Sequence, residues 1–279
     1  MKKALKIALF ALVGIFALVG ILFTSVFVGM RYGIFDVRGT IADRNSFFTL
    51  PLSGTACDAT GAICAWNQTP EWETVAGGLE KDAAVINTVS SETGVSSRMI
   101  AAVVVPEQMR FFTSEREIFK SYFEPLKILG SLSQFSLGVS GIKQDTAREI
   151  EVYANATSSP FYPGPGMAAL VAYAPGDVHD TALFNRLTDP KDHYYSYLYT
   201  ALYIKEIESQ WSRAGYDVSK NAGIVTTLFN IGFGNSKPNA LPQTGGAPVT
   251  IGGRIYAFGE LGGDFYASDE LVALFPKQL

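Results

Sequence analysis

Histidine and cysteine, the side chains most used to bind metals, are scarce: the chain of 279 residues has two of each. His179 and His193 stand apart in the sequence, and neither has the closely spaced Cys or His partners that a zinc site requires. Both are interpreted as loop or surface residues. We therefore expect neither a metal centre nor any other cofactor.

Basic side chains show no excess, because 22 Lys and Arg face 26 Asp and Glu and the formal net charge is −4. The absence of a basic stripe argues against nucleic acid as a partner. The sequence also lacks the phosphate loop GxxxxGK[ST], a GxGxxG after a strand, and the nucleophile motif GxSxG. These absences argue against nucleotide-binding proteins and serine hydrolases.

A long uncharged run is present near the N-terminus, at residues 7–30, with lysines before it and Arg31 after it. At about 1.5 Å rise per residue this length covers a bilayer core, and it exceeds the roughly 7 to 15 apolar residues of a signal peptide. No Ala-x-Ala cleavage site follows it. The run predicts a retained single-pass anchor in the cell membrane, with residues 1–6 cytoplasmic and the remainder outside.

Residues 31–74 are rich in Gly, Thr, Asn, Asp and Pro, a composition typical of a stalk between the membrane and a folded unit. Cys57 and Cys64 lie close together in this stretch, and a disulfide between them fits an oxidising compartment. The alternative is two free thiols in a cytosolic loop. Residues 75–279 have the length of one domain.

The most distinctive stretch of that domain is an apolar segment at residues 94–111. Ser96 or Ser97 can cap the start of a helix there, because a side-chain oxygen accepts hydrogen bonds from the first amides. Residues 99–105 are apolar on every side, which predicts a helix that other parts of the chain bury.

Glu107 is the carboxylate that this helix carries, and it shares a helix face with Ile100, Val103 and Val104. Burial there would raise the pKa of the Glu107 carboxyl, as a general acid near neutral pH requires. Pro106 is expected to bend or stop the helix close to this position. The alternative interpretation is a Glu at a helix end that turns to solvent.

The segment after a helical stretch at 114–135 reads SLGVSGIKQDTA and resembles a motif of the lytic transglycosylase and goose-type lysozyme superfamily. In that superfamily a helix ends in a catalytic Glu, and a Gly-Leu-Met-Gln-Ile-x-Pro-x-Thr-Ala segment follows. Two departures are Gly141, where the family has Gln, and Lys143-Gln144 in place of x-Pro. Residues 114–135 are an insertion relative to the family pattern. The matching positions are Gly138, Val139, Ile142, Thr146 and Ala147.

Further along the chain, Asp189-Pro190 and the long helix after it resemble the family's Asp-Pro helix start, where Asp caps the helix and Pro occupies its first turn. Tyr195, Tyr199 and Tyr203 recur every four residues on this helix, and we interpret them as core residues.

Residues 226–235 resemble the family's Ala-Tyr-Asn-Ala-Gly-Pro-Gly segment, with Phe229, Asn230, Gly232 and Gly234 on its Tyr, Asn, Gly and Gly. A helix end with an aromatic ring and an amide can hold an N-acetyl sugar by stacking and hydrogen bonds. The alternative is an ordinary glycine-terminated helix that Asn230 caps.

A β-hairpin is expected at 249–258, around Gly252 and Gly253, because the apolar residues alternate there. Tyr256 and Tyr266 are further candidates for residues that line a cleft, and the sequence does not decide between them.

The resemblance implies a mainly α-helical, lysozyme-like domain with a small β-hairpin. It also implies cleavage of the β-1,4 bond between N-acetylmuramic acid and N-acetylglucosamine in peptidoglycan. Glu107 would protonate the bridging oxygen, and a hydrolase would add a second carboxylate, for which Asp145 is a candidate. The alternatives are a catalytically inactive lysozyme-like wall-binding or assembly protein and an unrelated helical extracytoplasmic sensor or adaptor. The implied substrate-binding residues are Gly138, Ile142, Phe229, Asn230 and Gly232.

Overall fold

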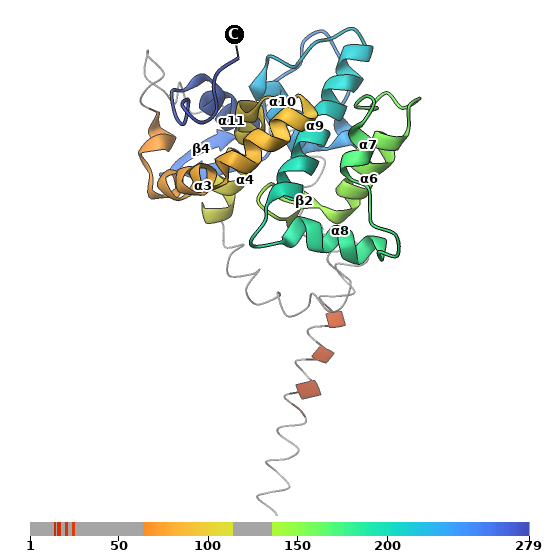
Figure 1. Ribbon diagram of the computed structural model, residues 1–279. Coiled ribbons are helices and arrows are strands. Elements are labelled where there is room, and N and C mark those ends of the chain that lie inside the picture. Colours follow the sequence, from red (N-terminus) through yellow and green to blue (C-terminus); the bar gives the residue numbers. More distant parts are fainter. Residues whose placement is uncertain are drawn as a thin grey trace, which may run out of the picture.

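The computed structural model describes residues 64–113 and 136–278, together with a few single residues between 14 and 25 (Figure 1). Within 64–278, outside the gap at 114–135, the chain forms eight α-helices. They are α3 (Pro70–Thr93), α4 (Ser97–Thr113), α6 (Gln144–Asn155), α7 (Met167–Leu170), α8 (His179–Thr188), α9 (Tyr194–Arg213), α10 (Ala222–Ile231) and α11 (Phe258–Ala267).

Two short antiparallel sheets and two 3-10 helices complete the described part. The sheets pair β1 (Ser136–Leu137) with β2 (Ile142–Lys143), and β3 (Pro248–Ile251) with β4 (Arg254–Ala257). The 3-10 helices are η1 (Ala65–Gln68) and η4 (Phe233–Asn235). The structure therefore confirms a mainly α fold with a small β-hairpin.

Helix α4 is the central element, since it contacts α3, α9, α10, α11 and β3. Every residue from 99 to 105 is buried, as its apolar pattern predicts. The Ser96 hydroxyl accepts a hydrogen bond from the Met99 amide at 3.1 Å and caps the helix. Pro106 does not stop the helix, because α4 continues to Thr113. Proline removes a single donor, and packing on all sides supports the turns that follow.

Helix α9 joins two groups of helices, because it packs against α3 and α4 on one side and α6 and α8 on the other (Figure 1). Tyr199 and Tyr203 are buried in this interface and Tyr195 is partly buried, so the tyrosine stripe does pack in the core. The strand β2 lies between the two groups in Figure 1 and leads directly into α6.

The predicted role of Asp189 as the cap of the long helix is wrong. Helix α9 begins at Tyr194 and its N-cap residue is His193. The Asp189 carboxylate instead accepts hydrogen bonds from the amides of Lys191 at 2.8 Å and Asp192 at 3.2 Å. Short acidic side chains often bond nearby amides in this way, and such a turn competes with helix formation.

The C-terminal region packs on α4 through the β3–β4 hairpin and α11. The hairpin pairs Pro248 with Ala257 and turns through Gly252 and Gly253, which confirms the predicted element. Arg98, in the first turn of α4, is fully buried and holds the chain at and beyond the end of α11. Its guanidinium donates to five backbone carbonyls at 2.5–3.1 Å, those of Phe265, Tyr266, Ser268, Glu270 and Phe275.

The packed domain begins before residue 75, its predicted first residue. Cys64 and Trp66 are fully buried in the core, and the Thr69 side chain caps α3 by accepting from the Trp72 amide at 3.3 Å. Cys64 is disulfide-bonded. Its predicted partner, Cys57, lies outside the described residues, so their pairing stays a prediction.

The predicted anchor at 7–30 and the insertion at 114–135 also lie outside the described residues, apart from single helical positions between 14 and 25. In the parts of the chain that the structure describes, none of the helices has both the length and the apolar character to cross a bilayer.

Candidate functional site

Glu107 lies near the C-terminal end of α4, where the helix leaves the core. Only 8% of the residue is exposed, while Ile100 and Val103, on the same face, are fully buried. The side chain is thus largely withdrawn from water, as the apolar pattern of the helix predicts. Local helix geometry is sufficient to produce this placement.

The turn between β1 and β2 lies directly against the Glu107 carboxyl. Gly141 has a φ of +63°, and a Cβ at this position would lie only 2.5 Å from the Glu107 carboxyl carbon. Both the left-handed backbone and the close approach require glycine. A Gln side chain at this position would therefore collide with the Glu107 carboxylate in this arrangement.

The same turn is attached on its other side to α9. The Ser140 hydroxyl donates to the Ser196 carbonyl at 3.1 Å. Gly138, with a φ of +63°, leaves no room for a side chain, since a Cβ there would collide with the Ser196 side chain and the Leu187 carbonyl. From α4, the Gln108 amide donates to the Val139 carbonyl. The turn is therefore held between α4 and α9.

Arg110 provides Glu107 with a cationic partner. Its Nη2 lies 2.5 Å from Glu107 Oε2, and its guanidinium carbon is 5.6 Å from the centre of the Phe258 ring. The spacing of three residues on one helix is the signal in the sequence from which this ion pair could be predicted. The carboxylate therefore has a mixed environment, with apolar side chains beneath it and a guanidinium beside it.

Helix α10 ends in a glycine, because Gly232 is its C-cap residue. The Phe229 ring is buried and packs on Tyr203 at 4.8 Å between ring centres. The Asn230 carbonyl oxygen accepts from the Ala247 amide at 2.8 Å. The Asn230 amide nitrogen has no partner among the described residues and can donate to a ligand.

Phe258 and Gly246 connect the Asn230 segment to Glu107. A Cβ on Gly246 would lie 2.9 Å from Asn230 Oδ1 and 3.1 Å from Phe258 Cβ. Phe258 in turn lies under the Arg110 guanidinium, which pairs with Glu107. Successive contacts through Gly246, Phe258 and Arg110 thus link two sequence segments that are more than a hundred residues apart.

Other residues that the sequence singled out lie elsewhere. Ile142 is 3% exposed and packs in the core, so its side chain does not line an open surface. Asp145 is exposed and forms an ion pair with Arg148. Tyr256 is buried at 1% exposure and is not a cleft residue. The Tyr266 ring is half-buried and lies 5.9 Å from the Arg98 guanidinium carbon.

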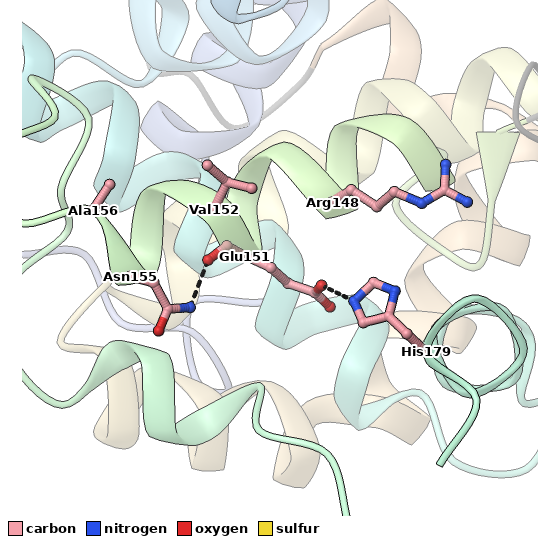
Figure 2. A pocket seen from close by; sticks show the side chains of 6 residues that line it. All are labelled: Arg148, Glu151, Val152, Asn155, Ala156 and His179. Atoms are coloured by element: carbon pink, nitrogen blue, oxygen red, sulfur yellow. Dashed lines mark hydrogen bonds and ion pairs between the residues drawn. The ribbon is translucent and has the colours of Figure 1, made fainter. Parts of the chain in front are cut away.

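A second polar cluster lies between α6 and α8, around the buried Glu151. Its carboxylate bonds His179 Nε2 at 2.6 Å on one oxygen, and accepts from the hydroxyls of Tyr173 and Tyr199 on the other. Figure 2 shows the Glu151 carboxylate pointing at the His179 ring. Glu151 and His179 border a cavity of about 550 Å³, together with Arg148, Val152, Asn155 and Ala156.

The protonation of this second cluster follows from its contacts. Burial alone lowers the pKa of His179, but its hydrogen bonds to Glu151 and Asp180 outweigh burial and raise it. Burial and the bond to Glu151 raise the pKa of Tyr173 to about 12. His179 is exposed and His193 lies in the loop before α9, as the sequence predicts, but each has a carboxylate partner, because His193 Nδ1 also lies 2.6 Å from Asp82 Oδ2. Partners so far away in sequence leave no local signal.

Among residues 64–113 and 136–278, no group of His, Cys, Asp and Glu has a geometry that could hold a metal ion. In the comparisons with known proteins, no protein family, no curated protein and no solved structure matches this chain. The site must therefore be interpreted from its own geometry.

Proposed function

We propose that the chain cleaves β-1,4 glycosidic bonds between N-acetylmuramic acid and N-acetylglucosamine in peptidoglycan, with Glu107 as the general acid and base. In this proposal the described helices form a divergent lysozyme-like domain. The observation that carries the proposal is the contact between the Glu107 carboxyl and the turn at Gly141. The resemblance in sequence requires these two segments to meet in space, and they do.

Each step of the reaction follows from the carboxyl group. A protonated Glu107 donates its proton to the bridging oxygen as the bond from that oxygen to the muramoyl C1 breaks. The muramoyl 6-hydroxyl then attacks C1, returns its proton to Glu107 and closes a 1,6-anhydro ring. The free amide N–H of Asn230 suits the N-acetyl carbonyl of the substrate. This route needs no second carboxylate, and Asp145 is therefore not assigned to it.

Zymography on purified cell walls tests the proposal. We expect the full chain to clear peptidoglycan and release anhydro-sugar products, and Glu107→Gln to abolish clearing, because a placed acid contributes about 10² to 10⁴ in rate. The matched control is Asp145→Asn, which removes an exposed carboxylate and should leave most of the clearing. Clearing by Glu107→Gln at the wild-type rate would disprove the assignment.

A second candidate is a protein that binds the wall or assembles in the cell envelope without cleaving it. One observation favours it: the Arg110 guanidinium already pairs with the Glu107 carboxylate, so a substrate would have to compete with Arg110 for this group. Sedimentation with purified walls separates the two candidates, because this second function predicts binding without clearing and without products.

We also propose that residues 7–30 form a retained membrane anchor and that the domain faces the cell wall. Cys64, which is disulfide-bonded, fits an oxidising compartment. Mass analysis of the mature N-terminus tests the anchor. A mature chain that starts after Gly29 would show that the segment is removed.

A further inference from the structure

Gln108 follows Glu107 on α4 and points to the same turn. Its side-chain amide donates to the Val139 carbonyl, which lies between the two tight glycine positions of the β1–β2 turn. This bond crosses from the helix that carries the carboxyl to the backbone that covers it. Gln108 itself is half-buried, so the bond is partly shielded from water.

The opposite side of the turn has its own attachment, which does not involve Gln108. Ser140 donates to the Ser196 carbonyl of α9, and Gly138 fits against Ser196 and the Leu187 carbonyl. Loss of the Gln108 bond would therefore leave the turn in place on α9. What would change is the separation between the turn and α4.

We propose that Gln108 is a positioning residue that sets this separation and thereby fixes the orientation of the Glu107 carboxyl. The contact at Gly141 is tight enough for a small movement to matter, since there is no room even for a Cβ, which would lie 2.5 Å from the carboxyl carbon. A misplacement of about 1 Å at a reacting group can lower the rate by roughly 10²-fold. This inference rests on the proposed cleavage reaction.

The test compares two substitutions of the same kind in the full chain. Gln108→Met keeps the length of the side chain and removes the donor. Gln210→Met is the matched control, because Gln210 also donates its side-chain amide to a backbone carbonyl, that of Ser236 at 3.1 Å, and it lies in α9 outside the site. Gln108→Met should lower Tm by about 2 to 4 °C, the effect of one lost hydrogen bond. Gln210→Met should lower Tm by at least as much, because it also removes the bond that Gln210 Oε1 accepts from the Ser236 hydroxyl.

The two variants should differ in kinetics on soluble peptidoglycan glycan strands. We expect Gln108→Met to lower kcat by roughly 10- to 100-fold with KM within about twofold of wild type, and Gln210→Met to leave kcat unchanged. Equal kcat for Gln108→Met and wild type, or an equal loss in both variants, would overturn the proposal. If Gln108→Met does not fold, Gln108→Asn, which withdraws the amide by one carbon, should give the same selective loss in kcat.

Hydrogen exchange separates this inference from the proposed function. If wild type releases no product, the proposed function fails, and amide exchange in residues 138–142 then decides the positioning role. Faster exchange of these amides in Gln108→Met, but not in Gln210→Met, supports the tie between α4 and the turn. Exchange as slow as in wild type refutes it.

Discussion

Glu206 provides the most direct test of the energetics of this fold. It lies in α9 with no exposed surface, and neither of its carboxyl oxygens has a hydrogen-bond partner among the described residues. Burial, with a smaller contribution from the charge of Glu149, raises the pKa of Glu206 from 4.5 to about 10. We therefore expect Glu206 to be protonated in the folded protein at neutral pH.

The pH dependence follows from the different proton affinities of the two states. Below pH 4.5 both states hold the proton, so stability is highest there with respect to this group. Between pH 4.5 and about 10 unfolding releases the proton, and the free energy of unfolding falls by about 1.4 kcal/mol per pH unit. From pH 5 to pH 8 the loss is at most about 4 kcal/mol. Glu206→Gln keeps the shape of the protonated acid and removes this dependence.

Urea unfolding at pH 5 and pH 8, followed by tryptophan fluorescence, measures the effect. All three tryptophans, Trp66, Trp72 and Trp211, are buried and report on unfolding. The stability of Glu206→Gln relative to wild type should rise by up to about 4 kcal/mol between the two pH values. Glu80→Gln, on the exposed side of α3, controls for loss of a glutamate. A difference between Glu206→Gln and wild type that stays the same at both pH values would refute the burial argument.

Three further predictions concern other parts of the fold. Arg98→Met should lower the free energy of unfolding by about 3 to 5 kcal/mol, because five backbone carbonyls lose a charged donor. Thermal unfolding measures this loss of stability, and a loss under about 1 kcal/mol would contradict the prediction. Gly141→Ala should abolish wall clearing, because the Cβ of the alanine would displace the Glu107 carboxyl. Zymography measures the activity of this variant, and circular dichroism shows whether it still folds. The Cys57–Cys64 disulfide should contribute roughly 2 to 3 kcal/mol; free thiols on both residues in protein from its native compartment would refute it.

Local patterns were sufficient to predict several elements. The apolar run at 99–105 predicts a buried helix, because a helix that is apolar on every side is stable in this domain only when other parts of the chain cover it. The Ser96 cap, the turn at Gly252 and Gly253 and the glycine end of α10 follow from the conformations that these residue types prefer. Asp189 shows the limit, because the same side chain can cap a helix or a turn, and its surroundings select the turn.

The candidate site could be predicted only in part. The sequence singled out Glu107 and Gly141 separately. It did not predict that the two residues are in contact, or that the Glu107 carboxyl occupies the space that a side chain at position 141 would need. It also placed Tyr256 and Ile142 among candidate site residues, and both are buried. Which face of a short strand turns inward depends on the neighbouring helices, and the two residues of β2 or the four of β4 are too few to show it.

The sequence by itself determined the elements whose cause lies within a few residues: the buried helix of Glu107 with its Ser96 cap, the hairpin at Gly252 and Gly253, and the glycine end of α10. Only the tertiary structure decided which polar groups meet across long distances. The Glu151–His179 pair, the Arg98 contacts with the C-terminal carbonyls and the attachment of Gln108 to the β1–β2 turn are such cases. Local conformational preferences act through neighbouring residues, whereas hydrogen bonds and charges act through space, and folding alone brings those partners together.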